Sequence, residues 1–314
     1  MACERCGILK AVIVRPSDKS KICKMCFFEV FENEVHETVI SSNMFSKGEK
    51  VGVGVSGGKD STVLAYVLDL LNKKHEYGVE LVLLSVDEGI AGYRDYSIEA
   101  VCKNRDDLGL KLKIVSFSDI FGVTMDKVVE KVGRRGSCTY CGVFRRKAIE
   151  QAAREMGVDA IATGHNADDM AETVLLNIVR GDISRLRRCT LEKTNAQDDG
   201  NGGVMSLPRI KPFKNSYQKE IVLYAFHKQL RYFSSECVYS PEASRGDLRE
   251  LVKELEKINS KIIHNIIRSG EMLQSERSVS ANPTPCIICL HPTSSEKNIC
   301  NGCEFVRKLK ENGI

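Results

Sequence analysis

One stretch decides the fold of this chain: SGGKDS, residues 56–61. It follows the apolar run KVGVGV (50–55), which predicts a buried parallel strand, and it precedes a run with apolar residues at helical spacing. A turn rich in serine and glycine between a strand and a helix points backbone N–H groups at whatever lies over the helix N-terminus, and this geometry favours a phosphate. Lys59 adds a positive charge, and Ser56 and Ser61 add hydroxyl groups.

Two common phosphate-binding motifs fit this stretch poorly. A Walker A loop needs Gly-x-x-x-x-Gly-Lys-Ser/Thr, but here Asp60 follows the lysine and Val53 holds the first glycine position. Residues 52–57 do fit the Rossmann pattern Gly-x-Gly-x-x-Gly. That pattern also needs an acidic residue about 20 positions later, and the acid at the end of the next strand, Asp87, comes late. Dinucleotide binding is therefore the weaker alternative.

The string SGGKDS resembles instead the pyrophosphate loop of the adenine nucleotide alpha hydrolases. The resemblance implies that ATP is cut between its α and β phosphates, so that a substrate oxygen is adenylated and pyrophosphate leaves. In that superfamily the loop binds ATP, and the matching residues are Ser56, Gly57, Gly58, Lys59, Asp60 and Ser61. The simplest alternative is a Ser-Gly turn on the surface.

Composition narrows the class of protein. The 314 residues are 42% hydrophobic and 28% charged, which predicts a soluble globular chain with one sizeable core plus small modules. There is no 18-residue apolar run and the first residues do not resemble a signal peptide, so we expect a cytoplasmic protein without a membrane span. The net charge of +4 does not by itself require a nucleic-acid partner.

Strand and helix patterns alternate between residues 50 and about 180. Strands are predicted at 51–55, 81–86, 112–116 and 158–162, and helices at 60–74, 93–108, 119–132, 141–156 and 167–179. This alternation predicts an α/β fold with a doubly wound parallel sheet. Further helices are predicted at 28–47, 216–230 and 247–269, and a mobile loop at 190–204. We expect the following organisation: an N-terminal zinc module (1–27), a catalytic domain (28–273), a linker (274–285) and a C-terminal zinc module (286–314).

Ten of the 13 cysteines form five Cys-x-x-Cys pairs, and no secretory signal favours disulfides. The two outer sets, each of two pairs, have the spacing of four-thiolate zinc sites. They are Cys3, Cys6, Cys23 and Cys26 at one end, and Cys286, Cys289, Cys300 and Cys303 at the other. Because these segments are too short for cores of their own, metal must supply their folding energy. Free thiols in disordered tails are the alternative.

The fifth pair, Cys138 and Cys141, has no second pair nearby, and Cys237 is the best candidate for a third thiol. Basic neighbours and a helix N-terminus are expected to lower the pKa of such thiols. Three thiolates with an open fourth position suit an iron–sulfur cluster or a persulfide-carrying cysteine. A third zinc, or structural thiols, remain alternatives.

A second motif narrows the resemblance. The stretch TGHNADDMAET (163–173) follows a predicted strand and resembles the tRNA-modifying branch of the pyrophosphate-loop superfamily, namely the lysidine and the two-thiouridine synthetases. Lysidine chemistry needs no sulfur, so the middle cysteines favour the second group. The stretches 218–224 and 236–242 and the outer cysteine pairs resemble the catalytic subunits of cytoplasmic tRNA 2-thiolation over nearly the whole chain.

This resemblance implies ATP-dependent 2-thiolation of the wobble uridine of tRNA, through adenylation of the 2-carbonyl oxygen and displacement by sulfur. It implies a 4Fe-4S cluster or a sulfur relay at Cys138, Cys141 and Cys237, with catalytic roles for Lys59, Asp60 and Asp168. It also implies an adenylate site that includes Gly164, His165, Asn166, Asp168 and Asp169. Asp60, Asp168 or Asp169 is expected to hold a magnesium ion. Capping of the following helix is the alternative for the aspartate pair.

The implied partners are tRNA, a ubiquitin-like sulfur carrier, and a non-catalytic paralogue or a second copy of the chain. Two arginine-rich groups flank the motifs and are expected to contact RNA phosphates, with solvated surface charge as the alternative. They are Arg134, Arg135, Arg145, Arg146 and Lys147, and Arg180, Arg185, Arg187 and Arg188. The competing functions are another adenylating enzyme, such as an amidating ligase, and a zinc-bearing RNA-binding scaffold with a vestigial nucleotide loop.

Overall fold

The computed structural model describes residues 1–194, 197–198, 204–235, 237–239, 246–273 and 284–311. Its centre is a five-stranded parallel sheet in the order β5-β4-β3-β6-β9. The strands are β3 (Lys50–Gly54), β4 (Glu80–Asp87), β5 (Lys111–Ser116), β6 (Ala160–Ala162) and β9 (Arg209–Ile210). The predicted doubly wound parallel sheet is confirmed.

The strand order reverses next to β3. The chain moves outward from β3 to β4 and β5, and then returns to add β6 and β9 on the other side of β3. In doubly wound sheets, ligands bind beyond the carboxyl ends of the strands at such a switch point. The loops that follow β3 and β6 lie at this point, so the topology brings the two sequence motifs to one edge of the sheet.

Alternate side chains of β4 enter two different cores, one on each face of the sheet. Leu81 and Leu83 point into one core, and Val82, Leu84 and Val86 point into the other. The first face is covered by α1 (Lys24–Ser41), α2 (Lys59–His75), α3 (Arg94–Leu108) and α9 (Gln218–Lys228). The second face is covered by α4 (Phe117–Phe121), α5 (Met125–Val132), α6 (Arg134–Glu155) and α12 (Asn301–Glu311).

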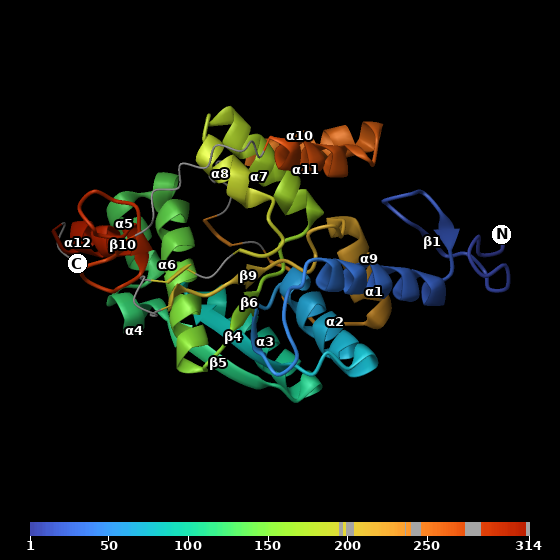
Figure 1. Ribbon diagram of the computed structural model, residues 1–314, viewed down its shortest axis with the longest axis horizontal. Coiled ribbons are helices and arrows are strands. Elements are labelled where there is room, and N and C mark those ends of the chain that lie inside the picture. Colours follow the sequence, from blue (N-terminus) through green and yellow to red (C-terminus); the bar gives the residue numbers. More distant parts are fainter. Residues whose placement is uncertain (195–196, 199–203, 236, 240–245, 274–283, 312–314) are drawn as a thin grey trace.

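A third group of helices forms a separate layer above the sheet (Figure 1). It consists of α7 (Ala167–Val179), α8 (Ile183–Cys189), α10 (Gly246–Ile258) and α11 (Ile262–Met272). Met170 and Ala171 of α7 pack there against Val252 and Ile263. Because α7 starts at the edge where β6 ends, this layer rises directly from the switch point.

The cysteine-rich ends of the chain lie at opposite ends of the molecule (Figure 1). At the N-terminus, the strands β1 (Ile13–Val14) and β2 (Lys21–Ile22) pair as a hairpin. At the C-terminus, β10 (Thr284–Pro285) pairs with β11 (Pro292–Thr293), and α12 then packs on α6.

Several predicted boundaries were wrong for local reasons. The predicted helix 119–132 is two helices, because Gly122 takes a φ of +73° that ends α4 and Thr124 caps α5. The predicted helix 247–269 is likewise divided into α10 and α11. The connecting helix starts four residues earlier than predicted, at Lys24, because Cys23 caps it. The sequence pattern did not predict β9, α8 or α12.

Parts of two predictions lie outside the described residues. In the predicted loop 190–204, the structure describes 190–194, the strand β7 (Gln197–Asp198) and the beginning of β8 (Val204–Ser206). The strands β7 and β8 pair with each other. In the predicted linker, residues 274–283 lie outside, and Thr284–Pro285 belongs to β10. Among the helices that the structure describes, none is both long and apolar enough to cross a membrane.

Candidate active site

The loop after β3 forms a cradle of backbone groups at the start of α2. Gly57 takes a φ of +82°, and a Cβ atom at this position would lie 2.4 Å from the backbone oxygen of Ser97, so the turn accepts only glycine. Ser61 Oγ accepts the Ser56 N–H at 3.1 Å and donates to the Gly58 carbonyl at 3.0 Å. These bonds hold the loop so that the first N–H groups of α2 face the space beyond the sheet edge, where an anion would be stabilised.

The loop after β6 lies directly on this cradle. A Cβ atom at Gly164 would lie 3.1 Å from the backbone carbon of Asp60, so the approach is close enough to favour glycine. Asn166 Nδ2 donates to Asp60 Oδ1 at 3.3 Å, and Lys59 Nζ lies 3.0 Å from Asp60 Oδ2. Burial raises the pKa of Asp60, and the Lys59 charge works in the opposite direction. The structure thus brings the two motifs, separated by about a hundred residues, into contact.

The second motif also builds the N-terminus of α7. Asn166 and Asp169 form a capping box, in which each side chain accepts the backbone N–H of the other residue. The interpretation of Asp169 as a helix cap is therefore confirmed. A role of Asp169 in binding a metal ion stays a prediction. His165 is exposed, and its Nδ1 shares a hydrogen bond with Thr163 Oγ1 at 2.9 Å.

Asp168 points into the protein. Its side chain is buried, and Oδ2 accepts the Gln218 N–H at 2.8 Å, which ties α7 to the start of α9. Burial raises the pKa of Asp168 to about 6, with further contributions from the charges of Glu256 and Asp169. This carboxylate therefore has a structural partner in addition to any role in catalysis.

The three internal cysteines approach each other from two segments. Cys138 and Cys141 lie on the first turns of α6, and Cys237 packs with Cys141 against the same core. Cys138 Sγ lies 3.9 Å from the carbonyl oxygen of Tyr239. Burial raises the pKa of Cys141, so the prediction that basic neighbours lower it is wrong for this thiol, although Arg145 acts in that direction.

The segment that carries Cys237 is also attached to the nucleotide loop. Phe233 donates its backbone N–H to the Gly57 carbonyl at 2.8 Å. Cys237 follows four residues later, so even an extended chain places its backbone no more than about 14 Å from that contact. The segment that carries Cys237 therefore runs next to the loop after β3.

An ion-pair network around the buried Glu88, which the sequence analysis did not identify, joins the same two parts. Glu88, directly after β4, lies with Oε1 2.8 Å from Arg145 Nε and with Oε2 3.2 Å from Arg94 Nε. Arg145 in turn donates to Cys141 Sγ at 3.5 Å, and Arg94 donates to the Ser56 carbonyl at 3.2 Å. The contacts form a continuous path from the nucleotide loop to a cysteine. A signal was present, because Glu88 follows a strand at the ligand-binding edge.

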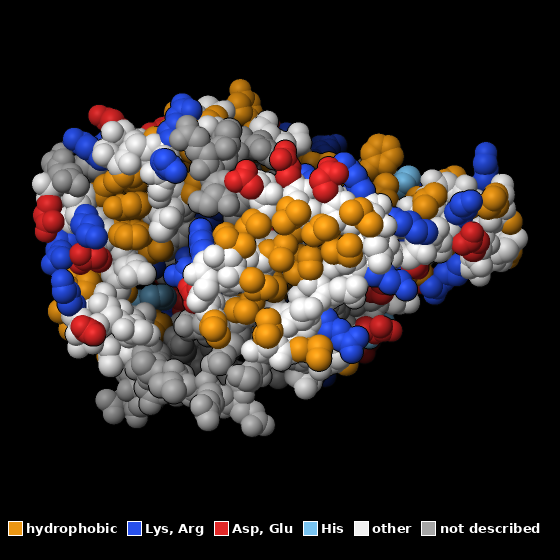
Figure 2. Space-filling model, turned by 90° about the horizontal axis from the view of Figure 1, so that it is seen from above, with side chains coloured by type: hydrophobic (Ala, Val, Ile, Leu, Met, Phe, Trp, Pro, Cys, Tyr) orange, Lys and Arg blue, Asp and Glu red, His pale blue; other side chains and the backbone are white. Residues whose placement is uncertain are grey.

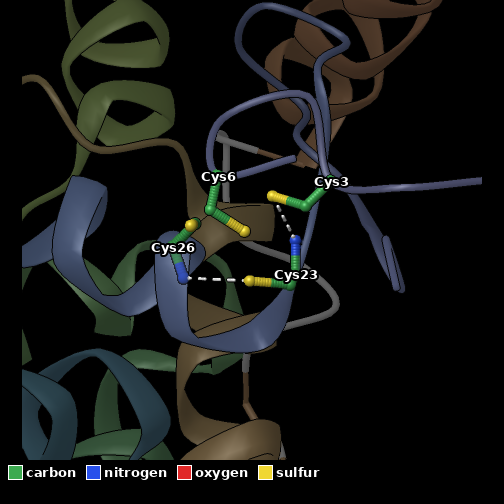
Figure 3. A group of neighbouring side chains, drawn as sticks. All are labelled: Cys3, Cys6, Cys23 and Cys26. Atoms are coloured by element: carbon green, nitrogen blue, oxygen red, sulfur yellow. Dashed lines mark hydrogen bonds between the residues drawn. The ribbon is translucent and has the colours of Figure 1, made fainter. Parts of the chain in front are cut away.

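The N-terminal cysteines form a compact thiolate set (Figure 3). Their four Sγ atoms all lie within 4.8 Å of one another and point toward a common centre. The Cys23 N–H donates to Cys3 Sγ at 3.2 Å, and the Cys26 N–H donates to Cys23 Sγ at 3.4 Å. Backbone donors of this kind stabilise negative charge on sulfur, so the set is suited to a metal ion.

The C-terminal cysteines form an equivalent set, again with all Sγ atoms within 4.8 Å of one another. Here a cation from the sheet domain takes part. Lys147 of α6 lies with Nζ 3.2 Å from Cys289 Sγ and 3.4 Å from the sulfurs of Cys300 and Cys303. Although burial opposes it, these thiolates raise the pKa of Lys147. Within the described residues, these two sets are the only groups of potential ligands this compact, so Cys138, Cys141 and Cys237 are spaced more widely.

Two of the residues predicted to contact RNA phosphates have partners within the protein. Arg145 is paired with Glu88, and Lys147 faces the C-terminal cysteines. Arg146 and Arg185 lie elsewhere, beside a surface groove. The side chains of Arg187 and Arg188 lie outside the described part of the structure, and contact of the arginine-rich groups with RNA phosphates stays a prediction.

Comparisons with known proteins agree with this geometry. The family model of the PP-loop domain matches residues 29–255. Cytoplasmic tRNA 2-thiolation protein 1 of Drosophila ananassae is 53% identical over 302 residues, which cover 96% of this chain and 82% of that protein. The protein of the same name from Drosophila yakuba is 52% identical over 306 residues, 97% of this chain and 87% of that protein.

A solved structure matches almost the whole chain. It is the U34-tRNA thiolase NcsA from Methanococcus maripaludis with its 4Fe-4S cluster, with a TM-score of 0.83 and 30% sequence identity. The match covers 98% of this chain and 96% of the archaeal one, so both cysteine-rich ends lie within the shared architecture.

Proposed function

Because this chain belongs to the cytoplasmic tRNA 2-thiolation protein 1 family, we propose that it is a cytoplasmic, ATP-dependent tRNA thiolase that acts on the wobble uridine. The proposal rests on one observation, the contact between the nucleotide loop and the segment that carries Cys237. The phosphate cradle and the segment with Cys237 are joined by the bond from Phe233 to Gly57. A nucleotide and a sulfur-carrying centre can therefore act on one substrate atom.

The cradle activates the uridine. The 2-carbonyl oxygen is a poor leaving group, and its attack on the α phosphate of ATP converts it into an adenylate while pyrophosphate leaves. Negative charge develops on the α phosphate in this step. The N–H groups at the start of α2 and the Lys59 ammonium stabilise that charge without reorganisation. Sulfur then forms a bond to C2 of the base, and AMP departs with the oxygen.

We assign a magnesium ion to Asp60 and Asp169. Hard cations prefer carboxylate oxygens next to phosphates, and these two carboxylates are close enough for the charge of Asp169 to raise the pKa of Asp60. Asp168 is the weaker candidate, because its buried side chain points into the protein, toward the start of α9.

Cys138, Cys141 and Cys237 are the proposed ligands of a 4Fe-4S cluster. Thiolates around one zinc ion lie about 3.8 Å apart, as Zn–S bonds of about 2.3 Å require. The sulfur atoms of each terminal set lie within 4.8 Å of one another, and those of these three cysteines do not. A larger cluster needs more widely spaced ligands, and three thiolates leave one iron open to bind and deliver sulfur. The archaeal relative NcsA has a 4Fe-4S cluster.

The two terminal sets are proposed structural zinc sites. Four thiolates in two Cys-x-x-Cys turns, with backbone N–H groups donating to sulfur, fit a closed tetrahedral ion. Both sets lie at the ends of the molecule and away from the switch point (Figure 1), so we assign them no catalytic role.

A protein partner is proposed for the helical layer above the sheet. Viewed from above, this face carries a band of hydrophobic side chains (Figure 2), and the exposed large residues of α7, α8, α10 and α11 belong to that layer. They are Ile178, Val179, Ile183, Leu251, Ile258 and Met272. An exposed apolar area of this kind commonly marks a protein interface. A second copy or a non-catalytic paralogue would cover it, and a ubiquitin-like carrier is the proposed sulfur source.

Substitution of the internal cysteines tests the sulfur step. In Cys141→Ser and Cys237→Ser, we expect thiolation of a tRNA transcript to be lost while tRNA-dependent pyrophosphate release continues, because adenylation needs only the cradle. Cys102→Ser, at a half-buried thiol of α3, is the matched control and should thiolate normally. Normal thiolation by either internal variant contradicts the proposal.

Chemical analysis distinguishes the alternatives at these thiols. Protein purified without oxygen should contain about four iron and four sulfide per chain, together with two zinc. Three zinc, or a persulfide without iron, would replace the cluster assignment with the corresponding alternative.

Lys59→Ala separates an enzyme from a scaffold. The enzyme needs Lys59 for charge stabilisation, so the variant should lose pyrophosphate release and thiolation together. Normal thiolation by this variant would favour an RNA-binding scaffold with an unused nucleotide loop. ATP-dependent release of pyrophosphate without sulfur incorporation, in the unmodified protein, would favour another adenylating enzyme.

A further inference from the structure

A second concave region, apart from the cradle, lies where the C-terminal cysteine module meets the sheet domain. It is a groove of about 940 Å³. One wall is a stripe of α6 that includes Val143, Arg146 and Glu150, which are spaced three and four residues apart and so lie on one side of the helix. The opposite wall comes from residues 291–295 of the C-terminal module.

Three arginines from three separate elements converge on this groove. Arg146 comes from α6, Arg185 from α8 and Arg209 from the start of β9. Arg209 is fixed in place, because its guanidinium donates to the Arg146 carbonyl at 3.0 Å and to Glu150 Oε2 at 3.2 Å. Arg146 Nε donates to the Gly142 carbonyl at 3.0 Å, which orients its guanidinium without using a carboxylate.

The positive charge of the groove exceeds the negative charge around it. Glu150 is the only acidic residue among the lining residues that the structure describes, and it also pairs with Arg154. Arg185 is paired with Asp182 at 3.2 Å. Burial and the charges of Arg209 and Arg185 lower the pKa of Arg146. Closely spaced guanidinium groups that repel one another are stabilised by a bound anion.

The opposite wall supplies hydroxyl groups and one imidazole, from Thr293, Ser294, Ser295 and His291. Guanidinium, hydroxyl and imidazole donors together are the groups that contact phosphate and ribose in nucleic-acid complexes. Donors of these kinds line both walls of a groove of about 940 Å³, so the groove offers contacts to phosphate oxygens and to sugar hydroxyls together, which fits a nucleic-acid strand better than a single ion.

We propose that this groove binds the sugar–phosphate backbone of the tRNA, at a point separate from the base that reacts. The inference rests on the proposed function for the identity of the RNA. Arg146 lies five residues after Cys141 on α6, about 7.5 Å further along the axis and about 140° around it. The groove and the internal cysteines thus lie on different sides of one helix. The backbone of the RNA would bind on one side of α6, and its target base would lie near the internal cysteines on the other side of this helix.

Because the contacts are to phosphates, they contribute to affinity and its salt dependence and not to the chemical step. The double variant Arg146→Gln/Arg185→Gln removes two of them and leaves Arg209 with its structural bonds. Binding of an unmodified tRNA transcript should weaken about tenfold or more at moderate salt. The slope of log K against log salt should fall by about 1.5. The KM for tRNA should rise, while kcat and the KM for ATP stay unchanged.

Arg105→Gln/Arg268→Gln is the matched control, because both arginines are exposed on helices that do not line the groove. It should retain the affinity and salt slope of the unmodified protein. An unchanged salt slope in the groove variant overturns the proposal, and so does an increase in the KM for ATP with tRNA binding unaffected, which would indicate a site for free phosphates.

This test is independent of the proposed chemistry. If the unmodified protein binds the transcript but does not thiolate it, the proposed function fails and the binding result still decides the role of the groove. If the groove variant alone binds poorly, the groove is supported whatever reaction the enzyme catalyses.

Discussion

At the scale of single residues, Glu88 connects the nucleotide loop with a cysteine through two arginines. Its carboxylate is 4% exposed and lies between two guanidinium groups, one of which reaches the nucleotide loop and the other Cys141. Buried ion pairs add little net stability compared with apolar groups, but removal of one partner is costly because charge is left unpaired. We therefore infer that the main role of the Glu88 carboxylate is to hold Arg94 and Arg145 in position.

We predict that Glu88→Gln destabilises the protein by about 3 kcal/mol, because two arginines lose their counter-charge. Thiolation should fall further than stability explains, since Arg145 is no longer held at Cys141. Denaturant unfolding gives the first quantity. Thiolation is measured at a temperature where the variant is folded. The visible absorption of the anaerobic protein is compared with this rate, because it reports the proposed cluster.

Glu99→Gln is the control for this prediction. Glu99 forms an exposed pair with Lys103 on α3, and such pairs contribute less than about 1 kcal/mol. If the two variants have equal stability and activity, the network from Ser56 to Cys141 has no special role.

At the scale of elements, the turn between β3 and α2 depends on one backbone conformation. Gly57→Ala should cost about 1–3 kcal/mol, because an alanine would be strained at a φ of +82° and would collide with the Ser97 carbonyl. ATP affinity should fall with it, since the N–H groups would be displaced. Thermal unfolding and ATP titration measure the two effects.

Gly58→Ala provides the comparison within the same loop. Gly58 takes a φ of −78°, and a Cβ atom there would lie 3.5 Å from its nearest neighbour, Ser56 Oγ. We expect its stability to stay within about 1 kcal/mol of the unmodified protein. A larger loss in Gly58→Ala than in Gly57→Ala would refute the steric argument.

The helix α6 combines several roles that its sequence shows only in part. Its first turns carry Cys138 and Cys141, after a break at Arg135 and Gly136, where Gly136 takes a φ of +101°. Further along, its buried side packs in the core through Phe144, and another side lines the groove. The apolar pattern predicted a helix from 141, but the break hid its true beginning.

At the scale of the whole molecule, the N-terminal cysteine set is part of the fold and not an appendage. Arg15, beside the cysteine hairpin, binds Glu220 of α9 through two nitrogens. Its Nε lies 3.2 Å from Glu220 Oε1, and its Nη2 lies 3.1 Å from Glu220 Oε2. The side chains of Arg15 and Glu220 are 6% and 1% exposed. Loss of the metal would disorganise the hairpin and leave Glu220 buried without its partner.

We therefore predict that Cys3→Ser/Cys6→Ser loses one zinc per chain and lowers the free energy of unfolding by about 2–4 kcal/mol. Metal analysis and denaturant unfolding measure the two effects. Cys189→Ser, at a thiol outside both sets, should keep its zinc and its stability. A double variant as stable as the unmodified protein would show that the hairpin folds without metal.

The nucleotide loop, the class of sheet and the two outer cysteine sets could be predicted from the order of residues alone. Each of these is encoded within a few neighbouring residues, since turn conformation, strand period and thiolate spacing are local properties of the chain. Three features became visible only in the folded protein: Glu88 joins Arg145 to the loop, Arg146, Arg185 and Arg209 line one groove, and burial outweighs basic neighbours at Cys141. These depend on which distant segments the strand order brings together, and on how far packing excludes water around them. Neither the neighbouring segments nor the degree of burial can be derived from the spacing of residues along the chain.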